Sequence, residues 1–138
     1  MSDTYISIIP KTKDYPERKA KANEILNWLI AKDIVKPELS DCTLGSDNGY
    51  SVSHGAKSVV DEPEYLPFDL ITNGLDIITE TQVFHPGQFW DDEDGDVSKL
   101  PESNLGFIFW NWPPFNETFI KEFKNKLGFD VEVMIGKL

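Results

Sequence analysis

The pattern of apolar and polar positions along the chain predicts two amphipathic helices. The first follows Asp14 and Glu17, a capping-box-like pair, and ends between Lys32 and Val35. The second begins with Asn116 as its N-terminal cap and ends at Gly128. The side chains expected on the buried faces of the two helices are Ala22, Ile25, Leu26, Leu29, Phe119, Ile120, Phe123 and Leu127.

Four runs rich in β-branched and aromatic residues predict strands. With the helices between them, they give the order strand, helix, strand, strand, helix, strand. This order predicts an α+β, ferredoxin-like (split βαβ) sandwich, in which two helices pack on one face of a sheet of at least four strands. The predicted strands are Thr4–Pro10, Leu75–Phe84, Leu105–Trp112 and Asp130–Ile135.

Pro37–Asp69 is the least regular part of the chain and carries three glycines and two prolines besides Pro37 itself. We interpret it as a long insertion after the first helix, with a short helix near Ala56–Val60. A connection of this length is uncommon in a small domain unless it has a function.

The strand Leu105–Trp112 is apolar on both faces. Phe107 and Phe109 point to one side, and Ile108, Trp110 and Trp112 to the other. One set must face the helices. The other lies on the second face of the sheet, where the insertion or a second copy of the chain would cover it, or where the tryptophans would anchor a partner.

Length and composition place the whole chain, residues 1–138, in one domain. A hydrophobic content of 40% argues against disorder. The sequence shows neither a membrane-spanning run nor a signal-peptide pattern, and its single cysteine, Cys42, fits a reducing compartment. We therefore expect a cytoplasmic protein that binds neither membrane nor nucleic acid, because its formal charge of −11 would repel phosphates.

The negative charge is concentrated in residues 38–102, where 15 acidic residues and two basic ones give a formal charge of −13. The densest run follows two aromatic residues. Charge at this density favours solubility, a cation or a basic partner. A basic partner would be attracted by the acidic groups and held by the aromatic ones. The predicted partner-binding residues are Phe89, Trp90, Asp91, Asp92, Glu93, Asp94, Trp110 and Trp112.

No motif predicts catalysis, a metal site or a cofactor. The acidic run fails the calcium-loop pattern, because Trp90 and Pro101 would occupy its first and last ligand positions. Cys42, His54 and His85 are too few for a zinc site.

The run TYISIIP at the start, NGLDIITETQVFHPGQ in the middle and the closing VEVMIG resemble small uncharacterised bacterial acidic proteins. The general profile also resembles the immunity proteins of bacterial toxin systems, which are small, acidic, tryptophan-bearing and cytoplasmic. The second resemblance implies a non-enzymatic, protein-binding role.

We therefore favour a non-enzymatic, acidic protein-binding domain, with an immunity-type role as its most concrete form. One alternative is a small-ligand-binding protein or enzyme with a pocket between the insertion and the sheet, lined by Tyr50, His54, His85 and Trp110. Another is a structural homodimer joined through the second face of the sheet.

Overall fold

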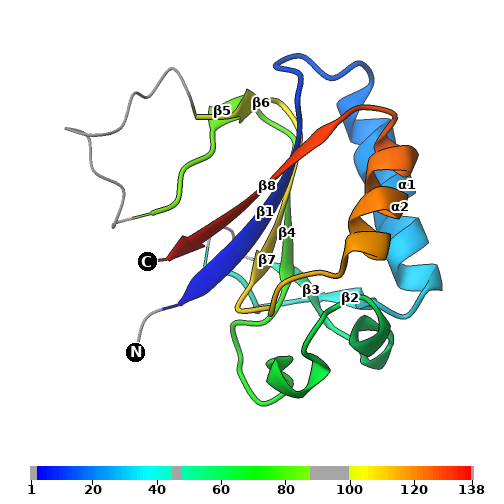
Figure 1. Cartoon of the computed structure of the whole chain (residues 1–138), viewed down its shortest axis with the longest axis vertical. Coiled ribbons are helices and arrows are strands. Elements are labelled where there is room, and N and C mark those ends of the chain that lie inside the picture. The colour runs from blue at the N-terminus through cyan, green and yellow to red at the C-terminus, as the bar shows by residue number, and fades with distance from the viewer. Residues whose placement is uncertain (1–2, 45–47, 88–99, 138) are drawn as a thin grey trace.

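The computed structural model describes residues 3–44, 48–87 and 100–137, which form a sheet with two helices on one face (Figure 1). The sheet has six strands in the order β2-β3-β4-β7-β1-β8, and all its pairings are antiparallel. A second sheet pairs two short strands, β5 and β6. In chain order the elements are β1 (Thr4–Pro10), α1 (Arg18–Ala31), β2 (Val35–Ser40), β3 (Gly49–Val52), the 3-10 helices η1 (His54–Ser58) and η2 (Pro63–Tyr65), β4 (Leu75–Ile78), β5 (Gln82–Val83), β6 (Glu102–Ser103), β7 (Gly106–Trp110), α2 (Glu117–Leu127) and β8 (Val131–Lys137).

The second helix begins and ends where the sequence predicts. The Asn116 side chain accepts a hydrogen bond from the Phe119 amide at 2.8 Å, which satisfies one of the unpaired donors of the first turn. Gly128 ends the helix at φ 76°, a conformation that favours glycine.

The first helix begins differently from the prediction. Its N-terminal cap is Glu17 at φ 54°, and no side chain caps the first turn, so the predicted capping box is wrong. On the two helices, six of the eight predicted core residues are buried, whereas Leu26 and Ile120 are only half-buried at the margin of the core.

The segment predicted as a long irregular insertion contains the two strands β2 and β3 as well as η1 and η2. The pattern of β2 is obscured because Pro37 lies inside it. A proline is tolerated there because β2 is an edge strand, and its register with β3 shifts between Val35 and Leu39. The predicted strand Leu75–Phe84 is also shorter, since β4 ends at Ile78 and β5 begins at Gln82.

The main core lies between the sheet and the two helices. Phe107 and Phe109 of β7 point into it together with Ile6 and Ile8 of β1. The Phe107 ring meets that of Phe123 from α2 at 5.0 Å between centroids, which ties the centre of the sheet to the second helix.

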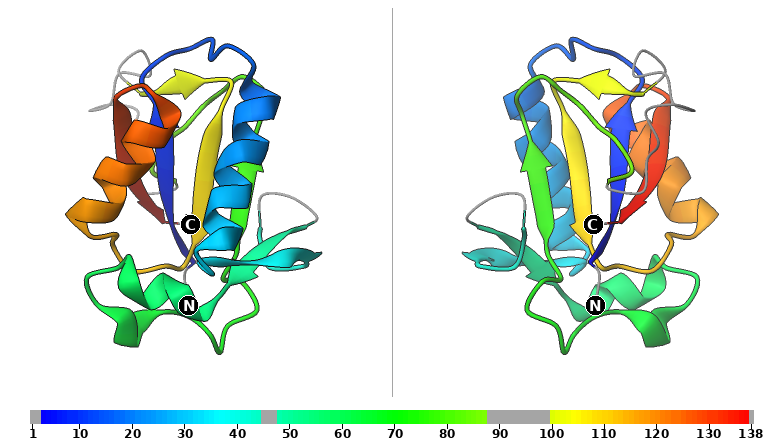
Figure 2. Two further views of the ribbon diagram at one scale, coloured as in Figure 1. Left: turned by 90° about the vertical axis from the view of Figure 1, so that its right-hand side faces the viewer. Right: turned by 90° about the vertical axis from the view of Figure 1, so that its left-hand side faces the viewer.

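Part of the opposite face of the sheet is covered by residues 82–87, which we call the crossing segment (Figure 2). Phe84 is 3% exposed and rests on Gly106, where a β-carbon would lie 2.4 Å from its ring. At the far end, the Lys137 amide donates to the Pro86 carbonyl at 3.0 Å. The chain that follows β4 therefore reaches across to the end of β8.

Candidate functional site

Six of the eight predicted partner-binding residues lie outside the described residues. They are Phe89, Trp90, Asp91, Asp92, Glu93 and Asp94.

The two tryptophans predicted as surface anchors are buried. Trp110 is 5% exposed and points to the second face of the sheet, as its alternation predicts. Trp112 is 3% exposed and faces the main core instead, where its ring lies 5.0 Å from that of Phe109. Asn111, at φ 64°, interrupts the strand alternation and turns Trp112 to the other side. Neither indole presents a face to a partner in this fold.

An exposed apolar surface occurs instead in the 61–71 loop, which contains η2. Four of its large side chains face solvent: Tyr65 is 66% exposed, Phe68 36%, Leu70 45% and Ile71 80%. Single exposed apolar residues are ordinary, but four within seven residues mark a candidate interaction surface.

The loop is held from below by buried groups. Leu66, 7% exposed, belongs to the main core. The Asn73 amide donates to the Leu70 carbonyl at 2.8 Å and to the Pro67 carbonyl at 3.2 Å. Trp112 in turn donates its indole N–H to the Asn73 backbone carbonyl at 2.6 Å. Trp112 therefore supports the loop from the core.

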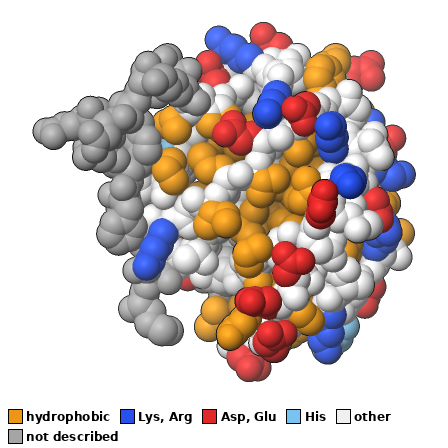
Figure 3. Space-filling model, viewed as in Figure 1, with side chains coloured by type: hydrophobic (Ala, Val, Ile, Leu, Met, Phe, Trp, Pro, Cys, Tyr) orange, Lys and Arg blue, Asp and Glu red, His pale blue; other side chains and the backbone are white. Residues whose placement is uncertain are grey.

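The same loop carries exposed carboxylates, and Figure 3 shows acidic side chains beside hydrophobic ones at the lower end of the molecule. The Lys57 ammonium lies 5.6 Å from the centroid of the Phe68 ring, so this aromatic face already holds a cation. The acidic residues of the loop, all exposed, are Asp61, Glu62, Glu64 and Asp69.

The residues of the predicted pocket are divided between different parts of the structure. Tyr50 is half-buried in β3 and packs against the main core. His54 is exposed, and its ring stacks on Phe68 at 5.0 Å, so it belongs to the surface of the 61–71 loop. His85 lies on the crossing segment and, with Trp110, lines a pocket on the second face of the sheet.

This pocket lies between the crossing segment and the sheet and has a volume of about 230 Å³. The Tyr5 hydroxyl donates to the His85 carbonyl at 2.8 Å, and burial raises the pKa of Tyr5, which keeps the phenol a donor. Two other lining residues carry a buried polar atom without a hydrogen-bond partner, the Ser7 hydroxyl and the Trp110 indole N–H. The residues that line the pocket are Tyr5, Ser7, Gln82, Val83, Phe84, His85, Ile108 and Trp110.

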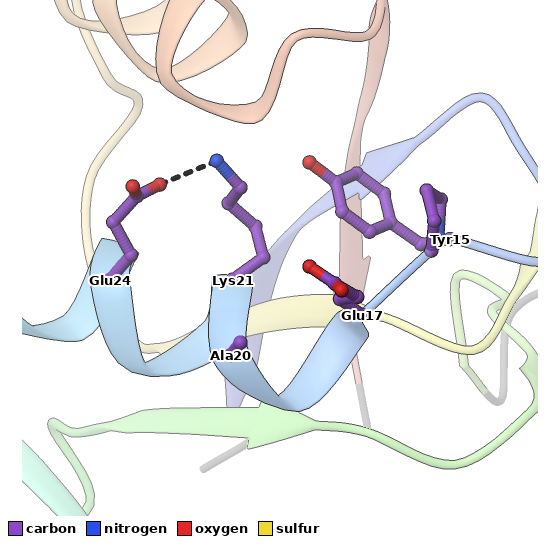
Figure 4. Close-up of a pocket in the computed structure, with 6 residues that line it drawn as sticks. Tyr15, Glu17, Ala20, Lys21 and Glu24 are labelled. Carbon is purple, nitrogen blue, oxygen red and sulfur yellow. Dashed lines mark hydrogen bonds and ion pairs between the residues drawn. The ribbon is translucent and has the colours of Figure 1, made fainter.

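A second pocket, of about 340 Å³, lies at the start of α1 (Figure 4). Three of its polar groups, on Tyr15, Lys21 and Glu24, have hydrogen-bond partners within the protein. The Lys21 ammonium donates to Glu24 at 2.5 Å, and this hydrogen bond lowers the pKa of the Glu24 carboxyl. The Tyr15 hydroxyl donates to the Leu127 carbonyl. This pocket is therefore a weaker candidate for ligand binding than the pocket beneath the crossing segment, where two buried polar groups lack a hydrogen-bond partner.

Metal ligands do not gather anywhere in the described part of the chain, where no three His, Cys, Asp or Glu side chains are grouped to hold an ion. Among the described helices, none has the length and apolar character needed to cross a membrane. Comparison of the chain with family models, with curated proteins and with solved structures finds no match.

Sequence reasoning missed the 61–71 loop because its apolar residues follow neither helical nor strand spacing. The available signal was the run Leu66-Pro67-Phe68-Asp69-Leu70-Ile71. It places four large apolar residues around one proline and one aspartate, where no regular element could bury all of them.

Proposed function

We propose that this chain is a non-enzymatic protein-binding domain that holds a basic protein partner on the 61–71 loop. The observation that carries the proposal is the group of four exposed apolar side chains among four exposed carboxylates, on a loop fixed from below by Asn73 and Trp112.

The two kinds of side chain have different tasks in such an interface. Exposed carboxylates attract a basic surface over several ångströms and raise the association rate. Tyr65, Phe68 and Ile71 provide the apolar area that the partner would cover, which governs dissociation. The Phe68 ring already has Lys57 over it and His54 stacked on it, so it contributes apolar contact to the interface rather than a further cation site.

An immunity-type role, in which the basic partner is a toxin, is the most concrete form of this proposal. It is supported by the small size, the formal charge of −11 and the concentration of negative charge in residues 38–102. The acidic run from Asp91 to Asp94, with Phe89 and Trp90, lies outside the described residues, and its contact with a basic partner stays a separate proposal.

Neutralising the loop should slow association with the partner. The immobilised chain is used to capture basic proteins from its native host, and binding kinetics with the captured protein are then measured at two salt concentrations. Changing Asp61, Glu62, Glu64 and Asp69 to their amides should lower the association rate about tenfold or more at low salt. The rate for the unchanged chain should itself fall as salt rises.

The matched control changes four carboxylates elsewhere, so that the net charge shifts equally. Asp14, Glu17, Glu117 and Glu132 are exposed and lie outside the loop, and their amides should reduce the rate much less. If both sets reduce it equally, the charge acts through the whole molecule and the loop is not the interface. A parallel set with amides at Asp91, Asp92, Glu93 and Asp94 tests the separate proposal for the acidic run.

The fold behind this surface is, we propose, a ferredoxin-like unit with two added strands. The strands β8-β1-β7-β4 lie in the order expected for a split βαβ sandwich, with antiparallel neighbours and with α1 and α2 on one face. The strands β2 and β3 extend this unit beyond β4.

A second candidate function is the binding of a small neutral ligand in the pocket beneath the crossing segment. Ser7 is 1% exposed and Trp110 5%, yet the Ser7 hydroxyl and the Trp110 indole N–H have no partner, and a buried unpaired polar group is costly. An indole N–H can only donate, so the ligand must offer an acceptor such as a carbonyl oxygen. Among the described residues that line the pocket there is no lysine or arginine, which disfavours an anion.

Benzamide and toluene are matched probes for this pocket, because both carry a benzene ring and only the amide has an acceptor. Calorimetry should show that benzamide binds about tenfold more tightly than toluene, and that Ser7→Ala and Trp110→Phe each weaken benzamide about two- to tenfold. Equal affinities of the two probes, or no effect of either variant, would mean that the pocket holds only water.

A further inference from the structure

The two edges of the sheet differ in how they are protected. At the β2 edge, Pro37 and the charged Lys36 and Glu38 lie within a strand whose register is irregular, and all three features discourage pairing with another strand. At the other edge, β8 pairs with β1 over seven consecutive residues without a bulge. Its edge carries no proline.

The backbone groups that β8 presents to its open side follow from the hydrogen bonds at its two ends. Lys11 donates its amide to the Asp130 carbonyl at 2.8 Å, so the pair Pro10 and Val131 is a non-hydrogen-bonded pair. The alternation of an antiparallel ladder then directs the N–H and C=O of Val131, Val133 and Ile135 away from β1. Lys137 follows the same alternation, because its amide donates outward to Pro86 at 3.0 Å.

The side chains of these outward-directed residues form an apolar stripe on the helix side of the sheet. Val133 and Ile135 pair with the core residues Ile8 and Ile6 of β1, yet they are 41% and 60% exposed. Figure 3 shows hydrophobic side chains running across the face on which β8 lies. Exposed apolar side chains and outward-directed backbone groups thus occur on the same residues.

We propose that β8 pairs with β8 of a second copy of this chain, in an antiparallel seam centred on Val133. Among the described residues, Pro86 and Gly87 meet the β8 edge only at Lys137, which leaves the segment 131–135 for pairing. A two-fold axis perpendicular to the sheet leaves the helices of both copies on the same side. It pairs residues 131–135 of one copy with the same residues of the other copy in antiparallel order. Val133 then lies opposite Val133 of the second copy, and Val131 lies opposite its Ile135.

This register gives the outward backbone groups hydrogen-bond partners and also buries the apolar side chains. The three residues with outward N–H and C=O groups meet three like residues as hydrogen-bonded pairs, and the apolar stripe meets its own copy. The Val131 amide exchanges its present contact, at 3.0 Å with the exposed Asp130 carboxylate, for a carbonyl of the second copy. The register avoids a direct clash of like charges, because Glu132 lies opposite Met134 of the second copy.

The mass in solution gives the first test. Analytical ultracentrifugation of the full chain should show a species of twice 15.7 kDa that dissociates on dilution. Val133→Lys places two ammonium groups opposite each other at the axis and should raise the dissociation constant about tenfold or more. The matched control is Leu39→Lys on the β2 edge, where Leu39 is 59% exposed, and it should leave the mass unchanged.

A cysteine at the axis tests the register. In the proposed seam, Val133→Cys faces its own copy at about 5.5 Å between Cα atoms, within the range that a disulfide spans. Mild oxidation should therefore give a covalent dimer, whereas Ile135→Cys on the same face, paired with Val131, should give none. Cys42 is buried and does not interfere. A mass of 15.7 kDa at every concentration, or equal cross-linking by the two cysteines, would overturn the proposal.

Discussion

Trp112→Ala should lower the free energy of unfolding by about 4 kcal/mol or more, the largest effect that we expect from one substitution. Trp112 is 3% exposed and packs on Phe109 and Phe115, so its removal leaves a large cavity. It also removes the indole N–H that donates to the Asn73 carbonyl at 2.6 Å, which leaves a buried acceptor unpaired. Chemical denaturation with the alanine variant measures the loss.

Trp112→Phe distinguishes the packing of the Trp112 ring from the hydrogen bond by which its indole N–H supports the 61–71 loop. The phenyl ring keeps most of the apolar contact but lacks the N–H, so about 1–3 kcal/mol should be lost. Because Asn73 fixes Leu70 and Pro67, this variant should also weaken binding of the basic partner although Trp112 touches no solvent-facing part of the loop. If the folded Trp112→Phe protein binds the partner with unchanged affinity, the Trp112 hydrogen bond does not hold the 61–71 loop in its binding conformation.

Phe123→Ala should cost about 4 kcal/mol and lower the melting temperature by roughly 10–20 °C. Phe123 is fully buried, and its ring meets those of Phe107, Phe119 and Trp28 at 5.0, 5.8 and 5.8 Å. These contacts join α2 to the sheet and to α1. Thermal unfolding followed by circular dichroism measures the change.

Phe129→Ala is the matched control for this variant. Phe129 is 38% exposed and has one described ring contact, with Tyr15 at 5.1 Å, so its loss should cost about 1 kcal/mol. Similar losses for Phe123→Ala and Phe129→Ala would contradict the position of the core between α2 and the sheet.

The predicted elements hold best where the side-chain pattern is strong and local. The stripe of Phe119, Phe123 and Leu127, with Asn116 and Gly128 at its ends, identifies α2 almost to the residue. The strand β2 was missed because a central strand excludes proline, whereas Pro37 lies at an edge. Whether a strand lies at an edge depends on pairings that no local pattern records.

The candidate site depends on backbone geometry more than on residue type. Trp112 was assigned to the wrong face because the turn at Asn111, φ 64°, lies between it and the strand. His54 and His85 were grouped by residue type, but one lies beside Phe68 and the other on the crossing segment. Tyr65 and Ile71 lie on a loop that is held by a hydrogen bond from Asn73, to which Trp112 donates in turn, and such long-range contacts leave no local pattern in the sequence. The concentration of negative charge, in contrast, could be read directly from the sequence.

Hydrogen exchange on the complex with the captured basic partner tests the central proposal most directly. If the 61–71 loop is the interface, peptides that cover residues 61–71 should exchange more slowly in the complex than in the chain alone. Peptides from β2, which has an exposed apolar residue of its own in Leu39, should be unchanged. Slower exchange elsewhere in the chain, with residues 61–71 exchanging as in the unbound protein, would contradict the account.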